Sequence, residues 1–185
     1  NIQAMSDHLG RYAKGFRPHS KTHKCPEIAK QQMAAGAVGI CTAKVSEAAV
    51  MASAGIDSIL ITSPISTRYK AQVVNAIITE QLTLLLVVDS IEGLSALQAE
   101  IDDDKRVGLL LDLDASTGRT GLRDNDLLLR LLDTMQNDAR FYFAGVQHYA
   151  GHVMHVPEFE KRRDKSMRAW ERLADKFALL EQQGM

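Results

Sequence analysis

The chain has 185 residues, a formal net charge of −1 and 45% hydrophobic residues. This composition is typical of a globular domain and excludes a disordered chain. The balance of charges argues against a nucleic-acid partner, which requires a clustered basic face. Its longest apolar run, Leu82–Val88, is too short to cross a bilayer. Cys25 and Cys41 lack the spacing of a disulfide framework or a zinc site. We therefore expect a cytoplasmic protein with reduced thiols and no membrane partner.

Short apolar runs alternate with longer stretches of helical periodicity along the whole chain. The apolar runs are rich in Val, Ile and Leu with little alternation, which is typical of strands buried on both faces of a parallel sheet. They predict strands over Gly15–Ser20, Ala37–Thr42, Ser58–Thr62, Leu82–Asp89, Arg106–Asp114 and Arg140–Gln147. The periodic stretches predict helices over Ile2–Lys14, Pro26–Ala35, Val45–Ala54, Thr67–Glu80, Ile91–Asp102, Asn125–Met135 and Pro157–Gln183.

The predicted helix boundaries follow local chemistry. Pro26 suits a first helical turn, Gly55 suits a C-cap, and Ser90 suits an N-cap. In the last helix an apolar stripe recurs at three- and four-residue spacing and should face a core. Its members are Trp170, Leu173, Phe177 and Leu180.

Regular strand–helix alternation predicts parallel strands joined by helical crossovers. An eightfold (β/α)8 barrel and a doubly wound open sheet both satisfy this pattern, and the pattern alone leaves the choice open. Six strand–helix units are predicted. On the barrel interpretation we expect the last two units, and any further domain, to lie beyond Met185.

The segment Phe16–Lys24 contains two lysines, two histidines and an arginine at the end of the first predicted strand. In an alternating strand Arg17, His19 and Lys21 point the same way, so His19 and Lys21 would share the barrel interior. Desolvation there would lower the pKa of Lys21 and make its amine a nucleophile for carbonyl groups, as a Schiff base requires. A solvated basic loop or a phosphate-binding patch explains the same residues from spacing alone.

Two further motifs follow the fifth and sixth predicted strands. The first, Asp112–Gly121, reads by itself as a glycine-containing loop with a solvated Arg119. In the second, Gly145–His152, Tyr149 reads as a half-buried aromatic residue and His152 as a surface residue.

Taken together, these segments resemble the D-threonine aldolase and D-serine dehydratase family, whose members are similar to alanine racemase. The resemblance is carried by residues 17–29, 35–41, 44–48 and 54–56 and by the two later motifs, in order along the chain. It implies an alanine racemase-type (β/α)8 barrel that binds pyridoxal 5'-phosphate, followed by a second, β-rich domain. It also explains why six units look incomplete.

The resemblance assigns a role to each matching residue. Lys21 corresponds to the lysine that forms the Schiff base with pyridoxal phosphate. Arg119 is expected near the phenolic oxygen of the cofactor, where a permanent cation stabilises an anion. Tyr149 would lie against the cofactor and Gln147 would line the pocket. His152 (with His155 near it) is a candidate for proton transfer, because imidazole titrates near neutral pH.

Other features of the family are expected outside this chain. The phosphate-binding loop follows the seventh strand, and a divalent metal (Mn, Zn or Mg), where present, is bound in the β-rich domain, so we expect no metal ligands here. Within the chain, Ser116 departs from the pattern, because relatives often have Gly there, and this puts the backbone of that loop in doubt.

The resemblance favours a lyase acting on D-amino acids. The segment Lys44–Ala48 and the spacing of Gln147 and Tyr149 look most like D-threonine or 3-hydroxy-D-amino-acid aldolases, which yield glycine and an aldehyde. D-serine dehydratase and an amino-acid racemase are the alternatives within the family. A non-catalytic pyridoxal-phosphate homeostasis protein is an alternative of another class. Relatives commonly dimerise, so we expect a homodimer.

Overall fold

The computed structural model describes residues 1–115 and 117–185. Five parallel strands form one sheet in the order β1-β2-β3-β4-β5. Their bounds are β1 Ile40–Thr42, β2 Ser58–Ile61, β3 Thr83–Val88, β4 Val107–Leu113 and β5 Phe141–His148. Strand order follows sequence order without a reversal, whereas a doubly wound sheet reverses its order at a switch point. The barrel interpretation is thereby favoured, and the sheet is an arc of it.

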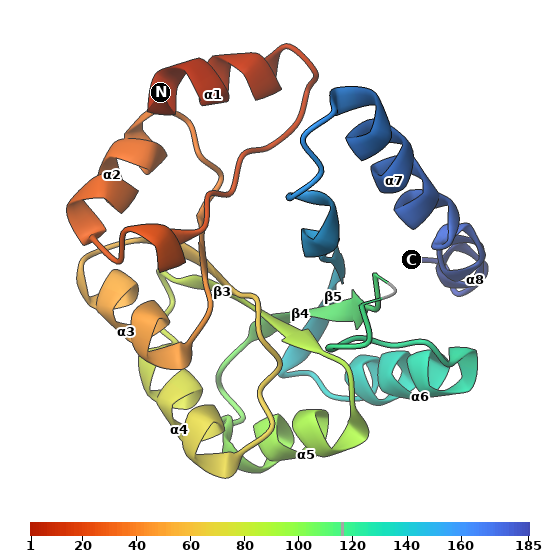
Figure 1. Ribbon diagram of the computed structural model, residues 1–185. Coiled ribbons are helices and arrows are strands. Elements are labelled where there is room, and N and C mark those ends of the chain that lie inside the picture. Colours follow the sequence, from red (N-terminus) through yellow and green to blue (C-terminus); the bar gives the residue numbers. More distant parts are fainter. Residues whose placement is uncertain (116) are drawn as a thin grey trace.

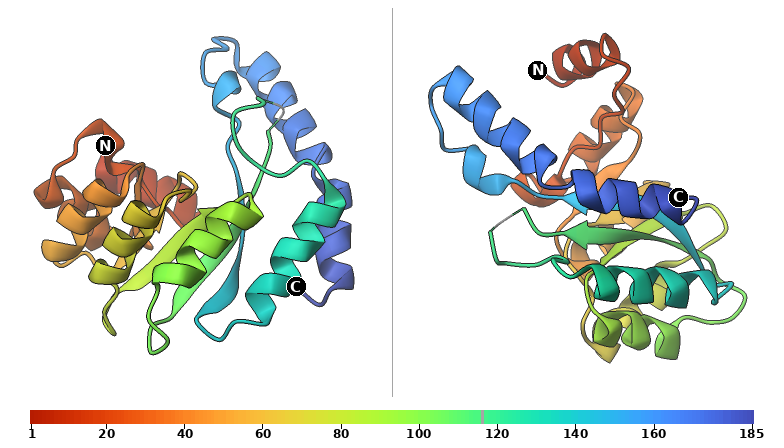
Figure 2. Two further views of the ribbon diagram at one scale, coloured as in Figure 1. Left: turned by 90° about the horizontal axis from the view of Figure 1, so that it is seen from below. Right: turned by 90° about the vertical axis from the view of Figure 1, so that its right-hand side faces the viewer.

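Helices lie around the outer side of this arc, and α1 and α7 lie away from the strands (Figure 1). Their bounds are α1 Ile2–Gly10, α2 Pro26–Ala34, α3 Val45–Ser53, α4 Arg68–Ile77, α5 Ile91–Glu100, α6 Asn125–Gln136, α7 Phe159–Glu171 and α8 Ala174–Gln182. Two 3₁₀ turns, η1 Ser20–Thr22 and η2 Gly151–Val153, complete the fold. None of the described helices is long and apolar enough to cross a membrane. Figure 2 shows α7 rising away from the sheet while α8 runs beside α6.

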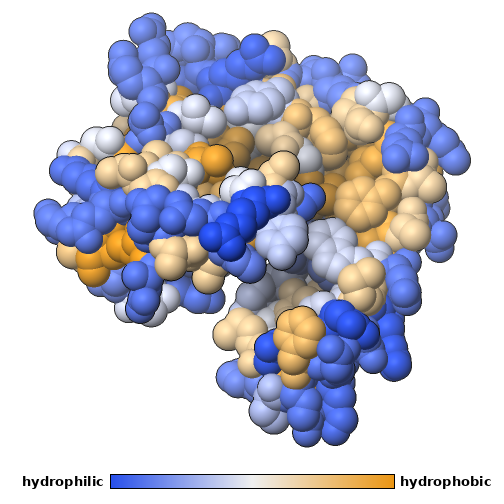
Figure 3. All heavy atoms as spheres, turned by 90° about the horizontal axis from the view of Figure 1, so that it is seen from above, coloured by the Kyte–Doolittle hydropathy of each residue, from blue (hydrophilic) through white to orange (hydrophobic). Residues whose placement is uncertain are grey.

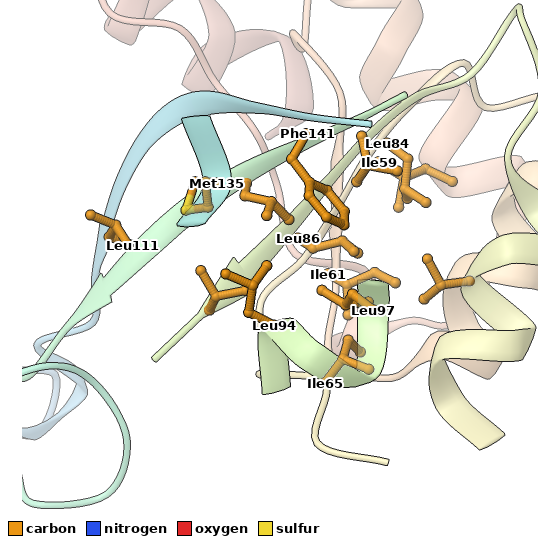
Figure 4. Close-up of a cluster of buried hydrophobic side chains, with 14 of the residues drawn as sticks. Ile59, Ile61, Ile65, Leu84, Leu86, Leu94, Leu97, Leu111, Met135 and Phe141 are labelled. Atoms are coloured by element: carbon orange, nitrogen blue, oxygen red, sulfur yellow. The ribbon is translucent and has the colours of Figure 1, made fainter. Parts of the chain in front are cut away.

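The main hydrophobic core lies between the sheet and these helices. Figure 4 shows how side chains from β2, β3 and β4 meet side chains from α5 and α6. Residues such as Ile61, Leu86 and Leu97 are fully buried there. Because outward-facing strand residues fill this core, the alternate residues face the barrel interior.

Two of the predicted elements differ from the structure. The first predicted strand, Gly15–Ser20, is extended, but within the described residues it makes a single parallel bridge, between His19 and Cys41. Backbone bonds from Val38 N to Phe16 O (2.8 Å) and from Cys41 N to Pro18 O (2.8 Å) hold it beside β1. Pro18 has no N–H to donate, and the chain turns into η1 at Ser20, so a longer ladder does not form. The sheet therefore has five strands where six were predicted.

The predicted terminal helix Pro157–Gln183 is two helices. Leu173 N bonds to Trp170 O (2.9 Å), an i→i+3 bond that ends α7 before α8 begins. Leu173 and Leu180 are buried as expected, but Trp170 is 54% exposed. Its ring lies 5.7 Å from the His148 ring and 6.5 Å from the Phe177 ring. On the face in Figure 3, apolar side chains likewise reach the surface between hydrophilic ones.

Candidate active site

The segment that carries Lys21 is a tightly bonded turn at the end of the extended segment beside β1. Ser20 is fully buried, and its hydroxyl donates to Cys41 O (3.0 Å). The carbonyl of Ser20 accepts from His23 N (3.1 Å) and from Lys24 N (2.7 Å). Lys24, which has a positive φ of 49°, forms an ion pair with Glu47 (3.4 Å). The backbone around Lys21 is therefore fixed by contacts on both sides.

Lys21 itself does not continue the strand. It lies in η1 and is exposed, so the expected alternation of Arg17, His19 and Lys21 ends at Ser20. Instead, Arg17 donates to Ser58 Oγ (3.0 Å) near the other end of β2. Lys21 therefore lacks, within the described part of the chain, the burial that was expected to desolvate its amine.

The His19 side chain holds the backbone of Lys21 by a hydrogen bond. Its Nδ1 accepts from Lys21 N (3.2 Å), so a neutral ring carries its proton on Nε2, which lies 3.2 Å from Thr62 Oγ1. Thr62 Oγ1 in turn donates to Thr42 O (3.1 Å). Burial lowers the pKa of His19 and the charge of Lys21 lowers it further, against an opposing effect of Glu47. These effects favour the neutral ring that this hydrogen-bond chain needs.

Arg119 follows β4 and Tyr149 follows β5, at the edge of the sheet opposite to β1, and both side chains approach Lys21. Lys21 Nζ lies 5.5 Å from the centroid of the Tyr149 ring, and Arg119 Cζ lies 4.9 Å from the same centroid. The Tyr149 ring lies over Gly151, where an added Cβ would lie 2.4 Å from a ring atom. A primary amine, a guanidinium and an aromatic ring thus converge from three separate segments of the chain.

The Arg119 loop is anchored to the strand ends by its neighbours. Asp114 Oδ1 accepts from Gly118 N (3.1 Å), and its other oxygen pairs with Arg123 (2.6 Å). Gly121 N donates to Asp89 Oδ2 (3.1 Å). Gly121 has a φ of 101° and packs against the backbone of β4, so glycine is required there. Ser116, where the sequence departs from the family pattern, lies outside the described residues.

Gln147 faces the interior below this loop. Its Nε2 donates to Asp112 Oδ1 (2.9 Å) and to Thr62 O (3.1 Å). Asp112 is 3% exposed, and burial raises its pKa, against hydrogen bonds from Gln147 and Thr120. Sequence reasoning singled out neither Asp112 nor Thr62. The signal available was their position, since each is a polar residue at or just past the end of an apolar strand.

His152 and His155 stand apart from this cluster. Both are exposed, and His152 lies in η2. Neither makes a hydrogen bond or ion pair with another described residue. Their predicted part in proton transfer is therefore not supported by a contact within the chain and stays a prediction.

The cluster fits the needs of pyridoxal phosphate, the cofactor that the resemblance implies. Lys21 offers an amine for the aldehyde, and Arg119 offers a permanent cation for the anionic phenolic oxygen. Gly151 has no side chain, and this leaves the space that the Tyr149 ring occupies beside them.

Comparisons with known proteins show which proteins the chain is similar to. D-threonine aldolase from an Arthrobacter species is 34% identical over 186 residues, covering 100% of this chain and 49% of the relative. A 3-hydroxy-D-aspartate aldolase from Paracoccus denitrificans is 27% identical over 187 residues, covering 100% of this chain and 48% of the relative. The chain thus spans about half the length of these curated relatives.

Solved structures extend the comparison to the fold. The crystal structure of D-threonine aldolase from Filomicrobium marinum superimposes with a TM-score of 0.91 at 32% identity, covering 100% of this chain and 50% of that one. Alanine racemase from Bacillus anthracis has the same fold, with a TM-score of 0.78 at 20% identity, covering 100% of this chain and 47% of that one. The family described as alanine racemase, N-terminal domain, matches residues 1–184. The chain belongs to this family, as its resemblance to the D-threonine aldolases and their relatives predicts.

Proposed function

We propose that the protein containing this chain is a pyridoxal-phosphate-dependent lyase of D-amino acids. Its substrate would be D-threonine or another 3-hydroxy-D-amino acid, cleaved to glycine and an aldehyde. The observation that carries the proposal is the convergence of Lys21 and Arg119 on the ring of Tyr149 at one end of the barrel. The similar aldolases from Arthrobacter and Paracoccus support the choice of reaction.

Each residue of the cluster has a task in this reaction. Lys21 supplies the amine that holds the cofactor aldehyde, and the η1 turn holds the backbone of that residue in place. Arg119 keeps a positive charge at the end of the barrel, and this charge disfavours protonation of the ring nitrogen of a bound cofactor. Tyr149 provides an aromatic surface whose face attracts both cations. When bound, pyridoxal phosphate accepts the electrons of the Cα bond that breaks.

We propose that the remaining parts of the enzyme lie outside this chain. They comprise the last barrel units, the phosphate-binding loop and a β-rich domain that holds a divalent metal. A metal that coordinates the β-hydroxyl of the substrate would favour its deprotonation. The coverage of about half of each relative supports this division. We further propose that the protein is cytoplasmic and forms a homodimer. Light scattering of the full-length protein would test the oligomeric state.

The role of Lys21 can be tested chemically. Borohydride reduction of the full-length protein with pyridoxal phosphate should fix a pyridoxyl group on the peptide that contains Lys21. Lys21→Ala should abolish both the labelling and the visible absorbance of the bound cofactor, whereas Lys24→Ala should retain both. Labelling that persists in Lys21→Ala would refute the assignment.

The reaction can be tested by its products. The full-length protein would be incubated with D-threonine, D-serine and 3-hydroxy-D-aspartate. We expect glycine and an aldehyde from D-threonine. Ammonia with a keto acid would instead indicate a dehydratase, the L-enantiomer would indicate a racemase, and cofactor binding without turnover would indicate a homeostasis protein.

A further inference from the structure

We propose that Gln147 is a positioning residue that ties two opposite walls of the barrel together, with Asp112 holding its amide in place. One wall carries Lys21 beside β1 and β2, and the other carries Arg119 and Tyr149 after β4 and β5. The tie fixes the spacing of these walls and hence the approach of the amine to the aromatic ring. This inference rests on the proposed function and adds the groups that align its site.

The tie crosses the barrel interior. Gln147 on β5 donates to the carbonyl of Thr62, which directly follows β2. These strands are not neighbours, because β3 and β4 lie between them. A side-chain amide has two N–H donors, and Gln147 uses them on Thr62 and Asp112. Gln147 therefore has no donor left for a substrate, and its part is to hold the protein together.

A β-bulge aims Gln147 at Asp112. Leu109 pairs with Phe143, but Leu110 pairs with Gly145, so β5 contains one extra residue at Ala144. Beyond the bulge Asp112 pairs with Gln147, whereas an uninterrupted register would pair it with Val146. Since successive strand residues face opposite sides, the bulge turns an amide rather than an isopropyl group toward the interior.

The tie reaches Lys21 through two hydrogen-bonded side chains. Thr62, whose carbonyl accepts from Gln147, also places its hydroxyl 3.2 Å from His19 Nε2. The other ring nitrogen of His19 accepts from the backbone N–H of Lys21 (3.2 Å). A shift of Thr62 would therefore move the ring that caps the Lys21 turn.

Asp112 is the fixed end of the tie. It is buried on β4, the strand beside β5, and accepts one of the two amide hydrogens of Gln147. Replacing it with leucine would leave that buried donor without a partner, which is unfavourable. We therefore expect the Gln147 amide to turn away and to weaken its bond to Thr62 in that variant. Asparagine at this position would still present an oxygen to Gln147.

The test compares four variants of the full-length protein without cofactor: Gln147→Leu, Asp112→Leu, Asp112→Asn and Gln98→Leu. Gln98 is the matched control, because its Nε2 donates to Asp138 Oδ2 (3.0 Å) at the opposite end of the barrel. Amide hydrogen exchange is followed in the peptide that contains His19 and Lys21. The loss of one buried hydrogen bond should raise its exchange rate about tenfold in the first two variants. Asp112→Asn should stay near the wild type, and Gln98→Leu should change exchange only around its own bond.

Binding of pyridoxal phosphate gives a second measurement. Its dissociation constant should rise about tenfold in Gln147→Leu and Asp112→Leu, by the same loss, and remain unchanged in Gln98→Leu. Unchanged exchange at Lys21 in Gln147→Leu would overturn the tie, and so would an equal increase in Gln98→Leu. If the wild-type protein binds no pyridoxal phosphate, the proposed function fails, but the exchange comparison still decides the tie.

Discussion

Gly121→Ala should damage the Arg119 loop far more than Gly118→Ala does. Both glycines have positive φ values, 101° and 67°, so alanine at either position costs about 1–2 kcal/mol in backbone strain. Among the described residues, the Cβ added at Gly118 meets the end of the Arg123 side chain (2.9 Å), which can move away. At Gly121 it meets backbone atoms of Leu113 and Asp114 at 2.6–2.9 Å, which cannot.

Relief of that clash requires the loop to separate from β4. It would break the bonds from Leu122 N to Asp112 O (2.8 Å) and from Asp114 N to Leu122 O (3.2 Å). At about 1 kcal/mol each, these two bonds bring the expected loss for Gly121→Ala to about 3–4 kcal/mol, against about 1–2 kcal/mol for Gly118→Ala.

Calorimetric unfolding of the full-length variants, with the visible absorbance of bound cofactor as a second signal, would measure the difference. Gly10→Ala is the control, since its Cβ would meet nothing within 4 Å and its φ is ordinary. Equal losses of stability in Gly118→Ala and Gly121→Ala would refute the close-approach argument.

Three further predictions concern titratable groups. Because the pKa of His19 is lowered, its neutral form stabilises the fold above about pH 6.5, and this contribution to the free energy of unfolding is lost as the pH falls below that value. The variant His19→Asn keeps an acceptor for the Lys21 turn and should flatten that part of the stability–pH curve. Burial raises the pKa of Cys41 to about 11, so peptide mapping after iodoacetamide treatment at pH 7.5 should find Cys25 alkylated and Cys41 unmodified. The Arg140 guanidinium lowers the pKa of Asp138 to about 2, so the stability lost in Asp138→Asn, about 1–3 kcal/mol at pH 7, should shrink as the pH falls from about 4 toward 2.

The strands that face the core were predictable from sequence. The segment that leads to the candidate site residues and the boundary between the last two helices were less so. The apolar runs that became β3 and β4 are buried from both sides, so composition alone marks them. The segment Gly15–Ser20 contains Pro18 and ends in polar residues, so its single bridge depends on tertiary contacts with β1. The break between α7 and α8 at Leu173 also lacks a local signal, because no glycine or proline occurs there.

The site shows the same division. The family motifs predicted Lys21, Arg119 and Tyr149 as site residues, and the structure places the first two side chains near the Tyr149 ring. The exposure of Lys21 was not predictable, because strand alternation said nothing about the turn at Ser20. The partnership of Asp112 with Gln147 depends on a one-residue bulge in β5, and hydrophobic patterning does not register such an insertion.

The arrangement also bears on how one barrel accommodates different reactions. The groups that would meet a cofactor, Lys21, Arg119 and Tyr149, are exposed at the ends of strands, whereas the polar network beneath them is half-buried or buried. The fold of the racemase from Bacillus anthracis matches the whole length of this chain, although the two sequences are only 20% identical. A shared frame with so few shared residues cannot by itself select between bond cleavage at Cα–Cβ and proton exchange at Cα. We therefore expect the choice of reaction to depend on the exposed layer and on the groups that face it. The network under Lys21 would instead determine how firmly the cofactor is held.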